Sequence, residues 1–105
     1  MQKTKRRKLA ARGWRSGTVA EFLQLTPEES QLIEIKLALS RQLKQRRTER
    51  MTQADLARRI GSSQPRIAKA EGGDASVSAE LLIRAILATG ASPRDIAKAI
   101  SAASS

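Results

Sequence analysis

Apolar residues recur three or four positions apart over most of the chain, which predicts helices, and no stretch alternates convincingly as a strand would. The first such stretch begins at Thr26-Pro27, a cap followed by a proline that suits the first helical position, and should run to about Glu49. One row of this helix is apolar and consists of Leu32, Ile35, Leu39 and Leu43. Ile33 and Leu37 fall elsewhere, so the helix has more than one apolar face.

The long helix changes character towards its end. Past Leu43 it carries basic residues in place of apolar ones, namely Lys44, Arg46, Arg47 and Arg50. We expect this end of the helix to face solvent or a phosphate, because arginine and lysine are seldom buried.

Thr52 marks the start of a short helix over residues 53–60, because its hydroxyl can accept a hydrogen bond from an amide of the first turn. The apolar residues of this helix share one face and are Leu56, Ala57 and Ile60. Gly61 follows where the helix must stop, and glycine adopts the left-handed conformation of such a stop at little cost. A tight turn is therefore predicted at Gly61.

A second short helix is predicted over residues 64–71, with Ser63 as its cap. Ile67 and Ala70 would be buried, whereas the outward side chains would be Gln64, Arg66, Ala68 and Lys69. Two short helices joined by a glycine-containing turn form a helix-turn-helix, which places its second helix in the major groove of DNA.

Two further helices complete the predicted domain. Gly72-Gly73 interrupts the chain, and Ser78 opens a helix over residues 79–88 that is apolar nearly all round, with Leu81, Leu82, Ile83, Ala85, Ile86 and Leu87. Such a helix is buried on several sides or shared with a partner. Ser92-Pro93 repeats the cap-plus-proline start for a last helix over residues 93–102, which should bury Ile96, Ala97 and Ile100.

The five predicted helices define an all-α domain. Its core should centre on nine residues: Leu39, Leu43, Leu56, Ile60, Ile67, Leu82, Ile86, Ile96 and Ile100. We assign residues 26–105 to this domain, with the motif at 52–73. Residues 1–25 are predicted to be a basic arm and a partner-binding segment. The arm should be disordered to about Ser16, with a short ordered element among Trp14, Val19, Phe22, Leu23 and Leu25.

The segment from residue 51 to residue 73 resembles the Cro/C1-type (XRE) helix-turn-helix family. In that family T-Q-x-x-L-A precedes G-x-S and a recognition helix that ends in I-x-x-x-E-x-G. The matching residues here are Thr52, Gln53, Leu56, Ala57, Gly61, Ser63, Ile67, Glu71 and Gly73. The resemblance extends from about Leu39 to Ile100 and implies a five-helix, lambda-repressor-like DNA-binding domain. The plainer alternative is a helical hairpin within a bundle of unrelated function.

The resemblance implies a set of DNA-contacting residues: Thr52, Gln53, Ser62, Ser63, Gln64, Pro65, Arg66 and Lys69. Gln53 matches a glutamine that anchors a phosphate and braces the recognition helix. Gln64 matches the first base-reading position, and its amide can bond to adenine N6 and N7. Arg66 and Lys69 can reach guanine or a phosphate, or else are simply solvated charges.

Pro65 departs from the polar residue that the family carries at the second base-reading position. A proline is tolerated in the first helical turn but donates no hydrogen bond, so Ser63 must cap the amide of Arg66 instead. Base discrimination at Pro65 must then be apolar, such as contact with a thymine methyl group. Ser62 and Ser63 can each touch a phosphate, although Ser63 can equally serve only as the cap.

The net charge of +10 is concentrated at one end of the chain. Residues 1–15 carry +7, residues 16–51 carry +1, residues 52–73 carry +2, and residues 74–105 are neutral. A basic arm beside a helix-turn-helix can lie along phosphates and add salt-dependent affinity. The alternative is a solvated tail that only keeps the protein soluble.

Composition argues against an enzyme and against cofactors. The chain has no Cys and no His, so the usual general base, nucleophile, disulfide and zinc ligands are missing. Gly72-Gly73 lacks the Lys-Ser/Thr context of a phosphate-binding loop. No apolar run approaches the roughly 20 residues of a membrane helix, so we expect a cytoplasmic protein that requires no membrane and no metal.

The expected partners are an operator in double-stranded DNA, a second copy of the chain and a toxin. One recognition helix reads few base pairs, so a homodimer is expected, with helices 79–88 and 93–102 as the candidate interface. The sequence is similar to HigA-type antitoxins, in which a helix-turn-helix is joined to a segment that masks a RelE-like toxin. Trp14 to Leu25 and the two-faced first helix favour this role, and a stand-alone Cro/C1-type repressor is the alternative. RNA binding is third, because the chain has few aromatic residues for base stacking.

Overall fold

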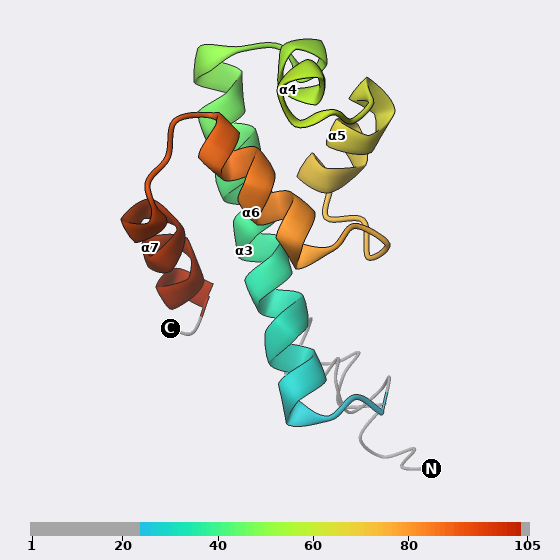
Figure 1. The fold of residues 1–105 in the computed structure, drawn as a ribbon. Helices are drawn as coiled ribbons and strands as arrows, with labels where there is room; N and C mark the ends of the chain where they lie inside the picture. Colours follow the sequence, from blue (N-terminus) through green and yellow to red (C-terminus); the bar gives the residue numbers. More distant parts are fainter. Residues whose placement is uncertain (1–23, 104–105) are drawn as a thin grey trace. The chain divides into compact units, whose positions relative to one another are not determined.

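The computed structural model describes residues 24–103, and the regular secondary structure of this part of the chain consists of helices joined by turns (Figure 1). Its helices are α3 (Pro27–Arg50), α4 (Gln53–Ile60), α5 (Gln64–Glu71), α6 (Ala79–Ala88) and α7 (Pro93–Ala103). The predicted all-α fold with five helices is confirmed for these residues, and each predicted boundary agrees to within one residue.

The chain divides into two compact units, residues 1–34 and residues 35–105. The predicted division after residue 25 therefore stays a prediction. The predicted disordered arm and the ordered element near Val19 lie outside the described residues. Among residues 24–103, no helix combines the length and the apolar character that crossing a bilayer would need.

Reciprocal caps explain why three of the helices begin where they do. The Thr26 amide donates to Glu29 Oε1 at 2.8 Å, and Thr26 Oγ1 accepts from the Glu29 amide at 3.1 Å. The same exchange joins Thr52 with Asp55, and Ser92 with Asp95. Each box satisfies two amides that would otherwise lack partners at a helix start. Bonds from the Thr52 amide and hydroxyl hold the pKa of Asp55 below its ordinary value.

The turn between α4 and α5 depends on Gly61. This residue has φ 68° and ψ 36°, the left-handed conformation that was predicted. The Ser62 amide donates to the Ala57 carbonyl at 2.8 Å and closes the end of α4. Gly73 has the same conformational requirement, because its φ is 78°, whereas the 2.9 Å contact of an added Cβ would be with Leu37 Cδ2, the end of an exposed side chain that can move aside.

The core lies within residues 35–105 and is built from all five helices. Six of the nine predicted core residues are fully buried, namely Leu39, Leu43, Leu56, Ile67, Leu82 and Ile86. Ile96 is also buried, whereas Ile60 and Ile100 are only partly buried and pack against the cluster. One expectation is corrected, since Ala97 is exposed. Leu32, which begins the predicted apolar row of the first helix, is 49% exposed.

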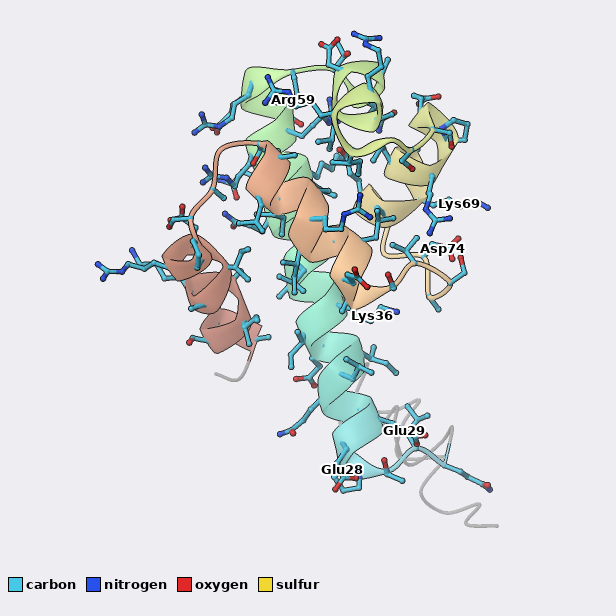
Figure 2. All side chains as sticks on the ribbon, viewed as in Figure 1. Glu28, Glu29, Lys36, Arg59, Lys69 and Asp74 are labelled. Atoms are coloured by element: carbon cyan, nitrogen blue, oxygen red, sulfur yellow. The ribbon has the colours of Figure 1, made fainter. Side chains whose placement is uncertain are left out.

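Helices α4 and α6 are joined by two arginines that exchange hydrogen bonds with carbonyl groups. Arg59 on α4 donates to the Ala88 carbonyl at the end of α6, at 3.1 Å. Arg84 on α6 donates to the Ile60 carbonyl at the end of α4, also at 3.1 Å. Each cation thus lies at the negative end of the other helix, where positive charge is favourable. Figure 2 labels Arg59 at this junction.

Candidate nucleic-acid interface

Helix α5 presents a continuous polar face, because its apolar side chains are directed into the core. Ile67 and Ala70 have no exposed surface, whereas the outward residues are Gln64, Pro65, Arg66, Ala68 and Lys69. Figure 2 shows Lys69 projecting outward from α5. The exposed side of α5 therefore carries two cations and one amide but no carboxylate, because Glu71 is buried. This charge pattern suits a polyanion.

The start of α5 has the arrangement expected from its proline. Ser63 is the cap, and its Oγ accepts from the Arg66 amide at 3.3 Å, as predicted for a helix with proline in the first turn. Pro65 itself is exposed, and its missing amide costs no hydrogen bond at this position. The first turn of α5 is therefore stable while it displays an apolar ring beside Gln64.

Gln53 and Gln64 bring the starts of α4 and α5 together. The Gln64 Nε2 donates to Gln53 Oε1, a side-chain bond between the first residues of the two helices. Both side chains line a hollow of about 640 Å³ that also includes Thr52. Gln53 thus contacts the first residue of α5 directly, as bracing of that helix would require. The predicted contact of Gln53 with a phosphate stays a prediction.

Arg47 is not solvated or phosphate-facing, and that expectation is wrong. Its side chain is only 15% exposed and forms a two-pronged ion pair with Glu71, whose side chain is 3% exposed. Arg47 Nε lies 2.6 Å from Glu71 Oε2, and Arg47 Nη2 lies 2.8 Å from Oε1. Arg47 Nη1 also donates to the Met51 carbonyl at 3.3 Å. Burial of either charge without the other would be costly. The ion pair therefore holds the end of α3 against the end of α5.

Gln53 completes this cluster, because its Nε2 donates to Glu71 Oε1 at 3.0 Å. A buried carboxylate, an arginine and two amides thus run in one chain from Arg47 to the exposed Gln64. Burial alone would raise the pKa of Glu71, but the hydrogen bonds from Arg47 and Gln53 outweigh it and hold the pKa below its ordinary value. Glu71 is therefore ionised at neutral pH and can only accept hydrogen bonds.

Ser62 differs from the other predicted DNA-contacting residues because its hydroxyl oxygen is buried. Its Oγ is buried and has no hydrogen-bond partner among the described residues. To reach a phosphate, the Ser62 hydroxyl would have to turn outward. Thr52 and Ser63 are exposed, so their positions need no such rearrangement.

Sequence reasoning missed the pairing of Arg47 with Glu71. In the sequence Glu71 stands out only as a match to the family pattern, and Arg47 lies 24 positions earlier in the chain. The available signal was an acidic residue at the end of a helix whose neighbours Ile67 and Ala70 face the core. A carboxylate there needs a buried cation, which the basic end of the first helix could supply.

Comparison with known families agrees with this geometry. Residues 38–99, more than half of the chain, match the family described as helix-turn-helix domain. No curated protein and no solved structure shows a significant match to the sequence. Within the described residues, no three acidic side chains gather into a group that could hold a metal ion. The match covers the capped pair α4 and α5 together with the core that supports them, so the chain belongs to the helix-turn-helix domain family of DNA-binding proteins.

Proposed function

We propose that this protein is a transcriptional repressor that binds a pseudo-palindromic operator as a homodimer. The proposal rests on the exposed face of α5, which bears Gln64, Arg66 and Lys69. The opposite face of this helix is fixed in the core by the fully buried Ile67 and Ala70. An α-helix with its side chains is about 10–12 Å in diameter, which fits a major groove about 12 Å wide. The N-terminal half of α5 then lies against base edges.

The residues of α5 divide into those that read bases and those that hold the DNA. Gln64 and Arg66 are placed to read, since glutamine suits adenine and arginine suits guanine. Pro65 offers only its ring and would contact a thymine methyl group. Lys69 serves as a reader or a phosphate contact. Thr52, Gln53, Ser62 and Ser63 would position the duplex through its phosphates.

Dimerisation is supported by apolar surface on α6. Leu87 is 41% exposed, whereas the neighbouring core residues of α6 are buried. Ile83 and, on α7, Ile100 are only partly buried. A second copy seated on this surface would cover these side chains and set two recognition helices one helical turn of DNA apart, or about 34 Å.

The DNA-binding proposal is tested by comparing the affinity for an operator with the affinity for random duplex DNA. After an operator is selected from random duplex DNA, Gln64→Ala or Arg66→Ala should weaken operator binding by roughly 5- to 150-fold and relax one base position per half-site. Binding to random DNA should change much less. Truncating residues 1–12 removes six basic side chains and should weaken all DNA about equally, with a flatter salt dependence.

An exposed arginine remote from α5 provides the matched control, and Arg94→Ala on α7 should leave operator selectivity unchanged. Full selectivity in the Gln64 and Arg66 variants, together with its loss on truncation, would place the reader in the arm instead. Sedimentation that shows only monomer at tens of micromolar, with and without operator, would contradict the dimer.

We further propose that the repressor is the antitoxin of a toxin–antitoxin operon. The support is apolar surface at the start of α3, where Leu32 is 49% exposed and Ile33 is 43% exposed. Exposed aliphatic side chains that form a contiguous patch can mark a protein-binding surface, and these two would form part of one. The HigA-type resemblance suggests a small RelE-like toxin as the partner.

Co-expression with the protein encoded by the neighbouring gene tests this role. The pair should co-purify, and the double substitution Leu32→Asp/Ile33→Asp should abolish co-purification while operator binding is retained. Gln31→Asp, an exposed position on the same helix, is the control that should keep the partner. Operator binding without any toxin partner would indicate a stand-alone repressor.

A further inference from the structure

We propose that the buried Arg47–Glu71 ion pair selects adenine at the base read by Gln64. It does so by dictating which way round the amides of Gln53 and Gln64 lie. The inference rests on the proposed reading of DNA by α5. Glu71 is 8% exposed and lies in the core, so its role would be that of a positioning residue rather than a DNA contact.

The Glu71 carboxylate determines the orientation of the Gln53 amide. Ionised Glu71 has only acceptor atoms, and Arg47 already donates to both of its oxygens. A glutamine amide that faces this carboxylate must therefore present its NH₂ group, and Gln53 Nε2 does so at 3.0 Å from Oε1. The carbonyl oxygen of Gln53 is consequently directed away from Glu71 and towards α5.

The second step passes this orientation to the recognition helix. Gln53 Oε1 can only accept, so Gln64 must present its own NH₂ group to it, as it does. One N–H of Gln64 is used in this bond. A single N–H and the carbonyl oxygen of Gln64 remain free on an exposed side chain.

That remaining pair of groups suits one purine. In the major groove adenine offers an N6 donor and an N7 acceptor, which match one free acceptor and one free donor on Gln64. Guanine offers O6 and N7, both acceptors, so a glutamine with one free N–H satisfies only one of them. If Gln53 were reversed, Gln64 would turn its oxygen inward and present two N–H groups, the set that favours guanine. The ion pair therefore determines the base choice through two hydrogen bonds.

The test removes the ion pair without leaving a lone buried charge. The double variant Arg47→Met/Glu71→Leu replaces it with apolar side chains, a change that buried ion pairs often tolerate. With no carboxylate to face, Gln53 is free to reverse. Discrimination between adenine and guanine at the Gln64 position should fall from roughly 5- to 150-fold in the wild type to less than about threefold. The measurement is operator affinity with adenine or guanine at that one pair per half-site.

A second variant keeps the test decisive if the double variant does not fold. Gln53→Leu breaks the chain of hydrogen bonds but leaves Arg47 and Glu71 paired, and it should show the same loss of discrimination. A purely structural role for the pair would lower affinity for both operators and leave their ratio unchanged. A wild-type ratio in a folded double variant, or in Gln53→Leu, would overturn the inference.

The outcome also separates this inference from the function on which it rests. If the wild-type protein enriches no sequence from random duplex DNA, the proposed function fails. If it enriches a sequence, but Gln64→Ala alters a position at which adenine is not preferred, the positioning role fails while the DNA-binding proposal survives.

Discussion

Arg47→Met should lower the free energy of unfolding by about 3–5 kcal/mol at neutral pH, because it leaves the Glu71 carboxylate buried without its cation. The remaining bond from Gln53 is a single neutral donor and cannot offset burial of the charge. The double variant Arg47→Met/Glu71→Leu should recover most of this loss. Urea denaturation of the three proteins measures the effect, and a loss below about 1 kcal/mol in the single variant would show that Glu71 is readily solvated.

The same substitution should reverse the sign of the contribution that Glu71 makes to the pH dependence of stability. In the wild type the folded state lowers the pKa of Glu71, so the stabilisation from the pair is present above the ordinary pKa of glutamate and is lost as the pH falls through the lowered value. In Arg47→Met only burial and one amide act on the carboxyl group, which should raise its pKa. Protonation then favours the folded state, so the stability gap between variant and wild type should narrow from about pH 7 to about pH 4.

Leu56→Ala should destabilise the domain by about 2–5 kcal/mol, because this side chain is fully buried between α4 and the rest of the core. Leu32→Ala makes the same chemical change at a position that is 49% exposed, and it should cost less than about 0.5 kcal/mol. Both values come from chemical denaturation followed by circular dichroism. Equal losses in the two variants would mean that the buried face of α4 is misassigned.

The helix starts were predictable because their signals are local. Thr52 and Asp55 are three positions apart, and the capping box that they form depends on few residues outside their own turn. The same is true of Ser92 with Asp95. Gly61 was likewise predictable, since a left-handed residue is needed wherever a helix turns back on itself this tightly. Local chemistry therefore settles nearly all of the helix boundaries.

Contacts between distant residues could not be predicted in the same way. Arg47 pairs with Glu71 only because the ends of α3 and α5 come together in the folded chain, and its basic neighbours in the sequence suggested solvent instead. The partial burial of Ile60 and Ile100 has a related cause, because both residues lie near helix ends at the margin of the core. The exposed face of α5 was predicted, but its link to the core through Gln53 and Glu71 was only partly foreseen.

The exchange of hydrogen bonds between Arg59 and Arg84 has a consequence for local opening of the domain. Fraying of the last turn of α4 must release Arg84 from the Ile60 carbonyl, and fraying of α6 must release Arg59 from the Ala88 carbonyl. Neither helix end can therefore unwind without disturbing the other. Each bond therefore opposes fraying of the turn whose carbonyl it contacts, and amide protons in both turns should exchange with solvent more slowly than those of helix ends without such a bond.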